Sequence, residues 1–355
     1  MSAILAAWTV TICLSSCERD DAPLSENQGS GRTISFTAAS SSEWPDITKS
    51  PINNVGDLLG DGFIVWGSWT KCPDDDSYWL GEYASGVNNA VFGLSGTEVI
   101  ATDKNNDGKF DQARDTWVYT PERDWYKGYY TFAAAIPASG LLDYGIVATH
   151  TSDITFQNTT PVYINKLTLD FPDNSFDLSK AQIDLMTAFA IKDNSNENAD
   201  QIKFHFDHIC ARLNISLAVF DSRGNANPLD IESVTVYGLL NSIASPLEFT
   251  QTTNNVTSRI TASADRSTQA DPFHVANKGW EILPSTLESL DAEALIQDLL
   301  VFPGALSEDN PLKLKIDYTN PDRITKSIYI KITQGQWEAG KSYSYTFQAD
   351  MATLE

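Results

Sequence analysis

Basic residues are scarce in this sequence. Its 355 residues include 24 Lys and Arg against 47 Asp and Glu, which gives a formal net charge of −23. Binding to the phosphates of a nucleic acid requires a basic surface, so this balance argues against nucleic acid as a partner. Acidity of this size keeps an exposed protein soluble and identifies no ligand by itself.

Catalytic motifs are also missing. The sequence has four histidines, and the close pair His205 and His208 is spaced by three residues, whereas one face of a strand repeats every two. It contains no His-Glu-x-x-His, no Gly-x-Ser-x-Gly and no phosphate-cradling glycine loop. We therefore expect no enzymatic activity and no required cofactor.

Only four cysteines are present. Cys13 and Cys17 lie near the N-terminus, and Cys72 and Cys210 fall far apart in the remainder of the chain. Two such residues define no disulfide framework. Pairing stays open for an exported protein, and buried or free thiols are the preferred interpretation.

No apolar run at the N-terminus is long enough to cross a bilayer, which takes roughly 20 residues. The run from Ala3 to Leu14 is short and ends in Leu14-Ser15-Ser16-Cys17, which resembles a bacterial lipobox. This predicts a lipoprotein signal peptide over residues 1–17, lipidation of Cys17 and anchoring in the outer membrane. Met1 to Cys17 contains no Lys or Arg, so a start further upstream and a nonlipidated signal peptide are the alternatives.

Acidic residues follow the cysteine directly. Glu18-Arg19-Asp20-Asp21 resembles the surface-export signal of Bacteroidetes lipoproteins, with an ordinary solvated linker as the alternative. Residues 18–32, rich in Ser, Gly, Asn and Asp, are typical of a flexible tether.

Strand signals recur from Thr33 to the end of the chain. Apolar residues alternate with polar ones over residues 33–39, 209–219, 312–318, 328–332 and 343–347, as half-buried antiparallel strands require. Residues 63–66, after a Gly-Asp-Gly turn, and residues 129–136, a small-and-aromatic run ended by Pro137, are further predicted strands. Only Ser285 to Leu300 has apolar residues at helical spacing. Many strands with one helix predict an all-β protein of stacked sheets.

Two domains are expected for a chain of this length. The polar stretch from Lys192 to Gln201 is the best boundary between them. We therefore expect an N-terminal β-sandwich over residues 33–195 and a C-terminal β-sandwich over residues 196–355.

Several phrases together resemble the fimbrillin family of Bacteroidetes surface pili, especially its Mfa-like branch of type V pilin-like lipoproteins. They run in order over nearly the whole chain after Cys17: Thr48-Lys49-Ser50, residues 60–66, Trp117-Val118-Tyr119-Thr120-Pro121, Trp125, residues 130–134, residues 184–188, residues 204–213 and residues 337–346. The resemblance implies two transthyretin-like β-sandwich domains with Greek-key-like antiparallel sheets. It also implies a fimbrial subunit that assembles by strand exchange.

In that scheme a protease removes the first strand, and a strand of another pilus subunit fills the groove that is left. Carried over by position, the removable strand would be Thr33 to Ala39 and the cut would follow Lys49. The family usually has Arg at the cut, so a Lys-tolerant protease, a cut at Arg32 and no processing all stay open. The family also continues further past the last Tyr-Thr strand, which suggests a tip or minor subunit, or a relative that does not polymerise.

The stretch from Asp103 to Asp111 has oxygen-bearing side chains at alternate positions and a glycine for a tight turn. Asp103, Asn105, Asp107 and Asp111 match the start of an EF-hand-like calcium loop. The twelfth position is Arg114 where a Glu would complete the ligand shell. A calcium site and a solvated hairpin are both open.

The first half of the chain is dense in large aromatic residues. Flat rings can stack on sugars or fill a sandwich core, and strand phase favours the core. The leading hypothesis is a cell-surface fimbrial subunit that contributes to adhesion to host or bacterial ligands. The alternative is a lipid-anchored surface glycan-binding protein.

Overall fold

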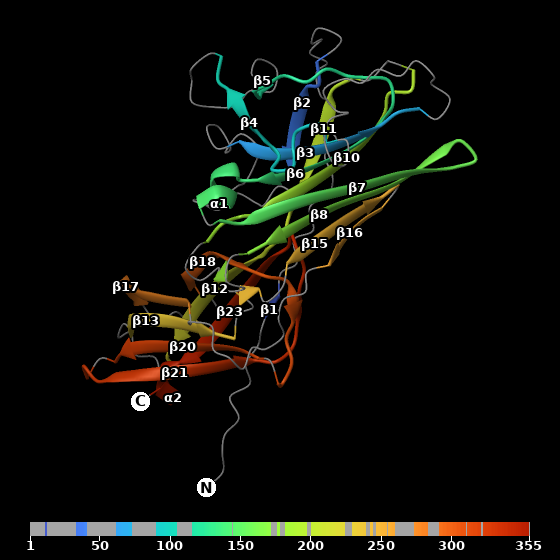
Figure 1. The fold of residues 1–355 in the computed structure, drawn as a ribbon. Helices are drawn as coiled ribbons and strands as arrows, with labels where there is room; N and C mark the ends of the chain where they lie inside the picture. Colours follow the sequence, from blue (N-terminus) through green and yellow to red (C-terminus); the bar gives the residue numbers. More distant parts are fainter. Residues whose placement is uncertain are drawn as a thin grey trace.

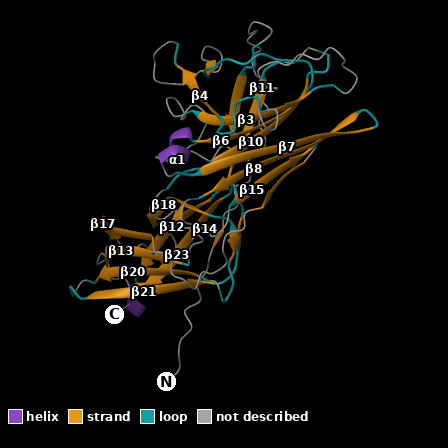
Figure 2. Ribbon diagram, in the orientation of Figure 1, coloured by secondary structure: helices purple, strands orange, loops and turns teal. Residues whose placement is uncertain are grey.

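The regular secondary structure that is described consists almost entirely of strands, with two short helices, and the expected all-β class is confirmed (Figure 2). The structure is a computed structural model. It describes residues 11–12, 33–40, 62–72, 90–104, 116–143, 145–171, 176–177, 182–196, 200–223, 229–238, 242–243, 246–253, 255–259, 273–282, 291–309, 311–320 and 322–354.

The elements follow one another along two bodies stacked on a long axis (Figure 1). The first part of the chain contains β1 (Thr11–Ile12), β2 (Phe36–Ser40), β3 (Phe63–Thr70), β4 (Thr97–Thr102), β5 (Thr116–Val118), β6 (Tyr129–Ile136), α1 (Ala138–Asp143), β7 (Val147–Gln157), β8 (Thr160–Asp170), β9 (Phe176–Asp177), β10 (Met186–Asp193) and β11 (Ile202–His208). The second part contains β12 (Ala211–Phe220), β13 (Leu229–Tyr237), β14 (Ser242–Ile243), β15 (Leu247–Thr252), β16 (Asn255–Arg259), β17 (Phe273–Ile282), β18 (Ala292–Val301), β19 (Gly304–Ala305), β20 (Leu312–Thr319), β21 (Thr325–Ile332), β22 (Gln336–Trp337), β23 (Ser342–Asp350) and α2 (Met351–Leu354).

The first body is built on a seven-stranded sheet with the order β2-β11-β10-β6-β3-β4-β5. The two edge strands of this sheet, β2 and β5, contact each other, which shows that the sheet is strongly curled. The curled face encloses an aromatic core with Phe36, Phe63, Tyr130, Phe132 and Phe204 among its members.

The opposite face of that sheet packs on a second sheet with the order β16-β15-β8-β7. Strand β6 therefore lies between two layers, and all eight of its residues are buried. The run Ala133-Ala134-Ala135 suits this position, since small side chains allow close packing on both faces of the strand.

The second body pairs two four-stranded sheets, β1-β23-β12-β18 and β17-β13-β20-β21. Their inner faces share one aliphatic core that includes Leu213, Ile215, Val234 and Ile316. The regular alternation of β20, β21 and β23 between buried and less buried residues confirms the strands expected there.

The chain returns once from the second body to the first. After β13 it forms β14, which pairs with β9, and then β15 and β16, which extend the sheet of β8. Strand β11 likewise belongs to the seven-stranded sheet. The domain boundary between residues 195 and 196 therefore stays a prediction. Strands from after this point pair in the first body, and β1, from before it, pairs in the second.

The helix expected over Ser285 to Leu300 is wrong from residue 292 onward, where the chain forms strand β18. The pairing of β18 with β12 shifts its register twice, and each shift places an extra residue in β18. One shift lies between Ala294 and Ile296, and the other lies between Ile296 and Leu299 and includes Asp298, which has a positive φ of 57°. Each bulge changes the alternation by one residue, so pairs such as Leu295 and Ile296 are both buried. The resulting spacing imitates a helical period.

Most of the described strand pairs are antiparallel, and two are parallel. Strand β2 runs parallel to β11, and β12 runs parallel to β23. In chain order β11 is the last strand of the seven-stranded sheet and β23 is the last strand of its four-stranded sheet, so each of these two sheets is completed only when that strand is in place.

Candidate functional site

The opening strand β2 packs into the aromatic core of the first body. We call the core residues that surround it, Phe63, Phe92, Tyr119 and Phe204, the seat of β2. Ile34, two residues before the strand, and Phe36 and Ala38 within it are at most 2% exposed. The period of two predicted from the sequence is therefore confirmed, and it directs these side chains into the aromatic core.

Phe36 is the anchor of this seat. Its ring lies 5.7 Å from that of Phe204 in a stacked arrangement and 5.5 Å from that of Tyr119 in an edge arrangement. The rings of Phe63 and Phe92 are 5.9 and 5.8 Å away. A side chain with four aromatic neighbours fills a pocket that would be left open without it.

Backbone groups hold the start of β2 on the side of β5. The Ile34 N–H donates to the carbonyl oxygen of Arg123 at 2.7 Å. The Tyr119 hydroxyl donates to the carbonyl oxygen of Ile34, also at 2.7 Å. Burial raises the pKa of Tyr119 to about 12, so the phenol keeps its proton and acts as a donor.

The other side of β2 pairs with β11. Phe36 is in register with Ile202, whose N–H donates to the carbonyl oxygen of Ser35 at 2.8 Å. The side-chain amide of Gln201 adds a bond of 2.9 Å to the carbonyl oxygen of Phe36. The strand is thus bonded on both edges near its start, although it is the terminal strand of its sheet.

A second N-terminal segment lies on the second body. Strand β1 pairs antiparallel with β23, with Thr11 opposite Thr346 and Ile12 opposite Tyr345. The strands β1 and β2 therefore each lie beside the strand that comes last in the chain within their own sheet.

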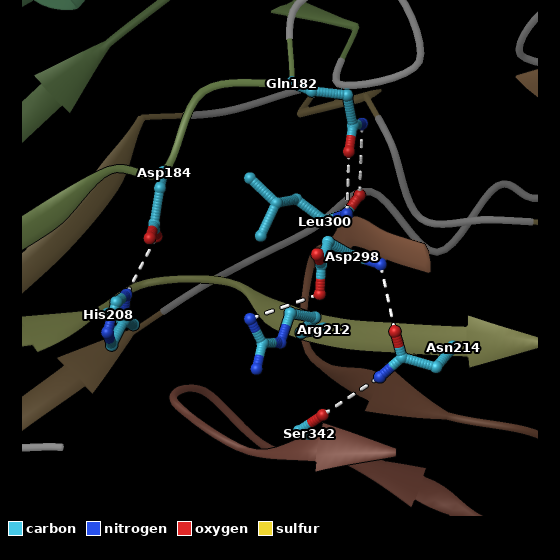
Figure 3. A network of polar contacts seen from close by, with 8 residues as sticks. All are labelled: Gln182, Asp184, His208, Arg212, Asn214, Asp298, Leu300 and Ser342. Atoms are coloured by element: carbon cyan, nitrogen blue, oxygen red, sulfur yellow. Dashed lines mark hydrogen bonds and ion pairs between the residues drawn. The ribbon is translucent and has the colours of Figure 1, made fainter. Parts of the chain in front are cut away.

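A buried polar network lies where the chain passes from β11 to β12 (Figure 3). His208 at the end of β11 and Asp184 before β10 are fully buried as side chains, with His208 Nδ1 2.8 Å from Asp184 Oδ1. The Ile209 N–H donates to the carbonyl oxygen of Leu185 at 2.9 Å. These contacts fix the end of the first body.

The same network continues into the second body. Arg212 is completely buried, and its Nη1 lies 3.2 Å from Oδ1 of Asp298 on β18. Burial raises the pKa of Asp298, and the charge of Arg212 opposes this rise. Asn214 accepts a bond of 2.9 Å from the Asp298 N–H and donates to the Ser342 hydroxyl at 3.3 Å.

Gln182 closes the network from the first body. Its side-chain oxygen accepts from the Leu300 N–H at 2.7 Å, and its amide donates to the Leu300 carbonyl oxygen at 3.4 Å. Strand β18 is therefore attached to the segment before β10. This arrangement makes the junction a fixed connection.

Sequence reasoning did not find this network. The alternation over residues 209–219 predicted a half-buried strand, but Arg212 and Asn214, which lie between the apolar core positions of β12, are buried as well. The signal available in the sequence was an arginine and an asparagine placed between apolar residues of one strand, which could have indicated buried polar side chains.

Cys72 and Cys210 are buried, and neither forms a disulfide. Cys72 packs with Tyr129 and Tyr163, and Cys210 lies in the core between the sheets of the first body, which confirms the preferred interpretation of free thiols. Burial raises the pKa of the Cys210 thiol, so it is kept neutral and unreactive.

Most residues of the predicted sites lie outside the described part of the chain. This applies to Cys17, Arg32 and Lys49, and to Asn105, Asp107 and Asp111 of the candidate calcium loop. Asp103 is described and follows β4 directly. Among the described residues, no group of three or more His, Cys, Asp or Glu is placed to hold a metal ion.

The described aromatic residues largely fill the core, as strand phase predicted. Trp66, Trp117, Tyr129 and Tyr130 are at most 8% exposed. In the same part of the chain, His205 is exposed and His208 is buried, as expected for opposite faces of a strand. None of the described helices is long and apolar enough to span a membrane.

Comparison with known proteins places this fold in a family. A family model described as fimbrillin-like matches residues 81–355. No curated protein gives a match. A solved structure of a fimbrial protein from Bacteroides vulgatus is 16% identical, with a TM-score of 0.46, over 91% of this chain and 96% of that one. A candidate cell adhesion protein from Bacteroides uniformis is also 16% identical, with a TM-score of 0.37, over 92% and 95% of the two chains. The family match covers well over half of the sequence, and the chain therefore belongs to the fimbrillin-like family.

Proposed function

We propose that this protein is a subunit of a cell-surface fimbria that polymerises by exchanging its opening strand for a strand of a neighbouring subunit. Fimbrillin-like proteins are structural and adhesive, and the chain is not an enzyme. The observation that carries the proposal is the seat of β2, an N-terminal edge strand whose side chains fill an aromatic core.

Loss of β2 would leave two kinds of unsatisfied surface. The rings around Phe36 would lose their contact, and the edge of β11 would lose its backbone partner. An incoming strand with apolar residues at alternate positions satisfies both, which is the physical basis of strand addition at a sheet edge.

The second body offers a matching edge. Strand β1 lies within the proposed signal peptide and pairs with β23. Cleavage before a lipidated Cys17 would remove β1 and open the outer edge of β23 before any cut at Arg32 or Lys49. Under this proposal the subunit is first anchored in the outer membrane by lipid and is then activated by a protease.

The rival glycan-binding function is supported less well. It was motivated by aromatic residues, and those that the structure describes are mainly core residues. Whether the subunit occupies the stalk, tip or base of a fimbria is a separate question that processing experiments address.

The test uses the chain from residue 17 with Cys17→Ser, treated with a trypsin-like protease. We expect N-terminal sequencing to find a cut after Arg32 or Lys49 and unheated gels to show ladders. The variants Arg32→Gln and Lys49→Gln separate the two cuts, since the ladder should vanish only when the operative site is lost.

A peptide competitor makes the test specific. A synthetic peptide of residues 33–40 should suppress the ladder because it refills the seat of β2, whereas the same peptide with Phe36→Ala should do so much less well. A cleaved chain that stays monomeric, or ladders that ignore both peptides, would contradict strand exchange.

A further inference from the structure

One hairpin of this acidic protein is basic. Between residues 312 and 332, which span β20 and β21, the chain carries five basic residues and two carboxylates, a net charge of +3 in a protein of −23. The basic residues are Lys313, Lys315, Arg323, Lys326 and Lys331, and the carboxylates are Asp317 and Asp322. The positive charge is therefore concentrated on one edge hairpin of the second body.

The arrangement of these charges costs stability. Lys313 and Lys331 lie directly opposite each other on the exposed face of β20 and β21, and like charges in that position destabilise a sheet. Lys331 holds Glu308 at 2.7 Å, whereas Lys313 makes no ion pair with any described residue. Glu308 compensates the charge of Lys331 within the fold, so Lys313 is the member of the pair whose charge is left to meet a partner outside it.

Exposed apolar groups lie in the same hairpin. Tyr329 is 72% exposed on β21, and Ile324 in the turn is 53% exposed. A surface that combines positive charge with apolar groups fits a partner with acidic and apolar groups.

The first body carries such a surface on β4 and β5. Ile100 and Val118 form an exposed cross-strand pair, and Leu94 nearby is 65% exposed. Glu98 lies on the same face of β4 as Ile100. Over residues 90–104 and 116–124 the chain holds four carboxylates, Glu98, Asp103, Glu122 and Asp124, and two basic residues, Lys104 and Arg123.

These two surfaces lie at opposite ends of the molecule (Figure 1). A contact between one surface and the other must therefore join two different copies. Because the two patches are unlike each other, such a contact leaves one patch of each kind free at the ends of a dimer, and repetition builds an open filament.

We propose that the β20–β21 hairpin of one copy docks on the β4–β5 face of the next copy by opposite charge and apolar contact. The occupant of the basic hairpin is thus a second copy of this chain. The inference rests on the proposed fimbrial function and adds an electrostatic contact that orients subunits before any strand is exchanged. Long-range attraction of this kind raises the rate at which correct pairs form.

The first test measures reversible self-association of the unprocessed chain by sedimentation velocity. We expect association at about 0.05 M salt and its loss at about 0.5 M, since the screening length falls well below 10 Å above 0.1 M. Lys313→Glu should weaken association by roughly tenfold, which corresponds to about 1.4 kcal/mol. The matched control Lys203→Glu makes the same change of charge at an exposed residue of β11 and should have little effect.

Stability separates this role from a structural one. Lys313→Glu replaces a repulsive pair with an attractive one opposite Lys331, so the melting temperature should stay the same or rise while association falls. A fall in both would indicate that the hairpin merely unfolds, and would overturn the inference.

A mixing experiment gives the sharpest outcome. Copies with Lys313→Glu and Arg323→Glu, and copies with Glu98→Lys and Glu122→Lys, should each fail to associate alone. A 1:1 mixture should associate again, because each altered surface then meets an oppositely charged one. Absence of this rescue would overturn the inference, as would a hairpin that binds phosphatidylglycerol vesicles through Lys313 while the chain never self-associates.

The two proposals fail separately. If ladders form after proteolysis at the same rate in Lys313→Glu as in the unaltered chain, strand exchange stands and the docking contact is wrong. If the unprocessed chain shows the mixing rescue but never forms ladders, the docking contact stands and strand exchange is wrong.

Discussion

At the scale of single residues, a histidine and an asparagine form a polar link between the two layers of the first body. His150 on β7 has its Nε2 2.7 Å from the side-chain oxygen of Asn165 on β8. The Asn165 amide in turn donates to the carbonyl oxygen of Phe132 at 2.8 Å and to the Gln251 side chain at 3.1 Å. An amide oxygen only accepts, so the imidazole must carry its proton on Nε2.

This contact makes stability depend on pH. Burial lowers the pKa of His150 in the folded protein, whereas the unfolded chain keeps a value of about 6.5. Below about pH 6.5 the unfolded state binds more protons, so stability falls as the pH falls, by at most about 1.4 kcal/mol per pH unit. Urea denaturation between pH 7.5 and 5.5 should show this loss, and His150→Gln, which keeps a donor amide, should reduce it. An equal loss in the variant would assign the effect to other groups.

Arg212 is a second residue whose contribution can be measured. Arg212→Met leaves Asp298 in a buried site without its cation, which should lower the free energy of unfolding by about 3–5 kcal/mol. The double variant with Asp298→Asn removes the buried charge and should recover part of the loss. Urea denaturation of the single and double variants measures the difference, and simple additivity of the two losses would contradict a direct pairing.

At the scale of elements, the hold on β2 can be weakened at a single hydroxyl. Tyr119→Phe keeps the ring beside Phe36 but removes the donor to the Ile34 carbonyl oxygen, a loss of about 1 kcal/mol. Strand β2 should then open about fivefold more often. Hydrogen exchange of the Ile202 amide, which donates to Ser35, reports this opening.

The control for this prediction is the second body. Amides of β13 and β20 share no contact with β2, so their exchange should not change. Faster exchange throughout the protein would indicate global destabilisation and would contradict a local hold by Tyr119.

The sequence predicted those elements whose apolar residues form an uninterrupted pattern. Strands β20, β21 and β23 were found because a period of two persists along each of them. Strands β3 and β6 were found from continuous apolar or small-and-aromatic runs, which fit strands buried on both faces. Strand β18 was misread because two bulges against β12 break that period. A bulge depends on the neighbouring strand, and a local pattern contains no information about that neighbour.

The site around β2 was also predicted only in part. The apolar face of residues 33–39 was predicted from alternation, and the family resemblance gave its role. Its parallel pairing with β11 and the burial of Arg212 depend on residues far away in the chain. The return of β15 and β16 to the first body has the same origin and could not be predicted from local pattern.

At the scale of the whole molecule, the two bodies should unfold together. Leu247 and Phe249 of β15 and Phe302 after β18 are buried in the core of the first body although they follow the second body's first strands. Scanning calorimetry should therefore show one transition, with equal calorimetric and van't Hoff enthalpies. Two separated transitions would show that the bodies fold independently, as the boundary at residue 195 would suggest.

The pairing of β2 with β11 and of β1 with β23 also orders events in time. A chain that emerges amino end first presents residues 36–40 more than 160 residues before their partners at 202–206, and residues 11–12 long before 345–346. Contacts so distant in sequence form late in folding. The edge of β11 thus comes into existence together with the strand that already covers it, so the nascent first body has no interval in which that edge is finished but vacant. The edge of β23 is covered in this way only until β1 is removed with the proposed signal peptide.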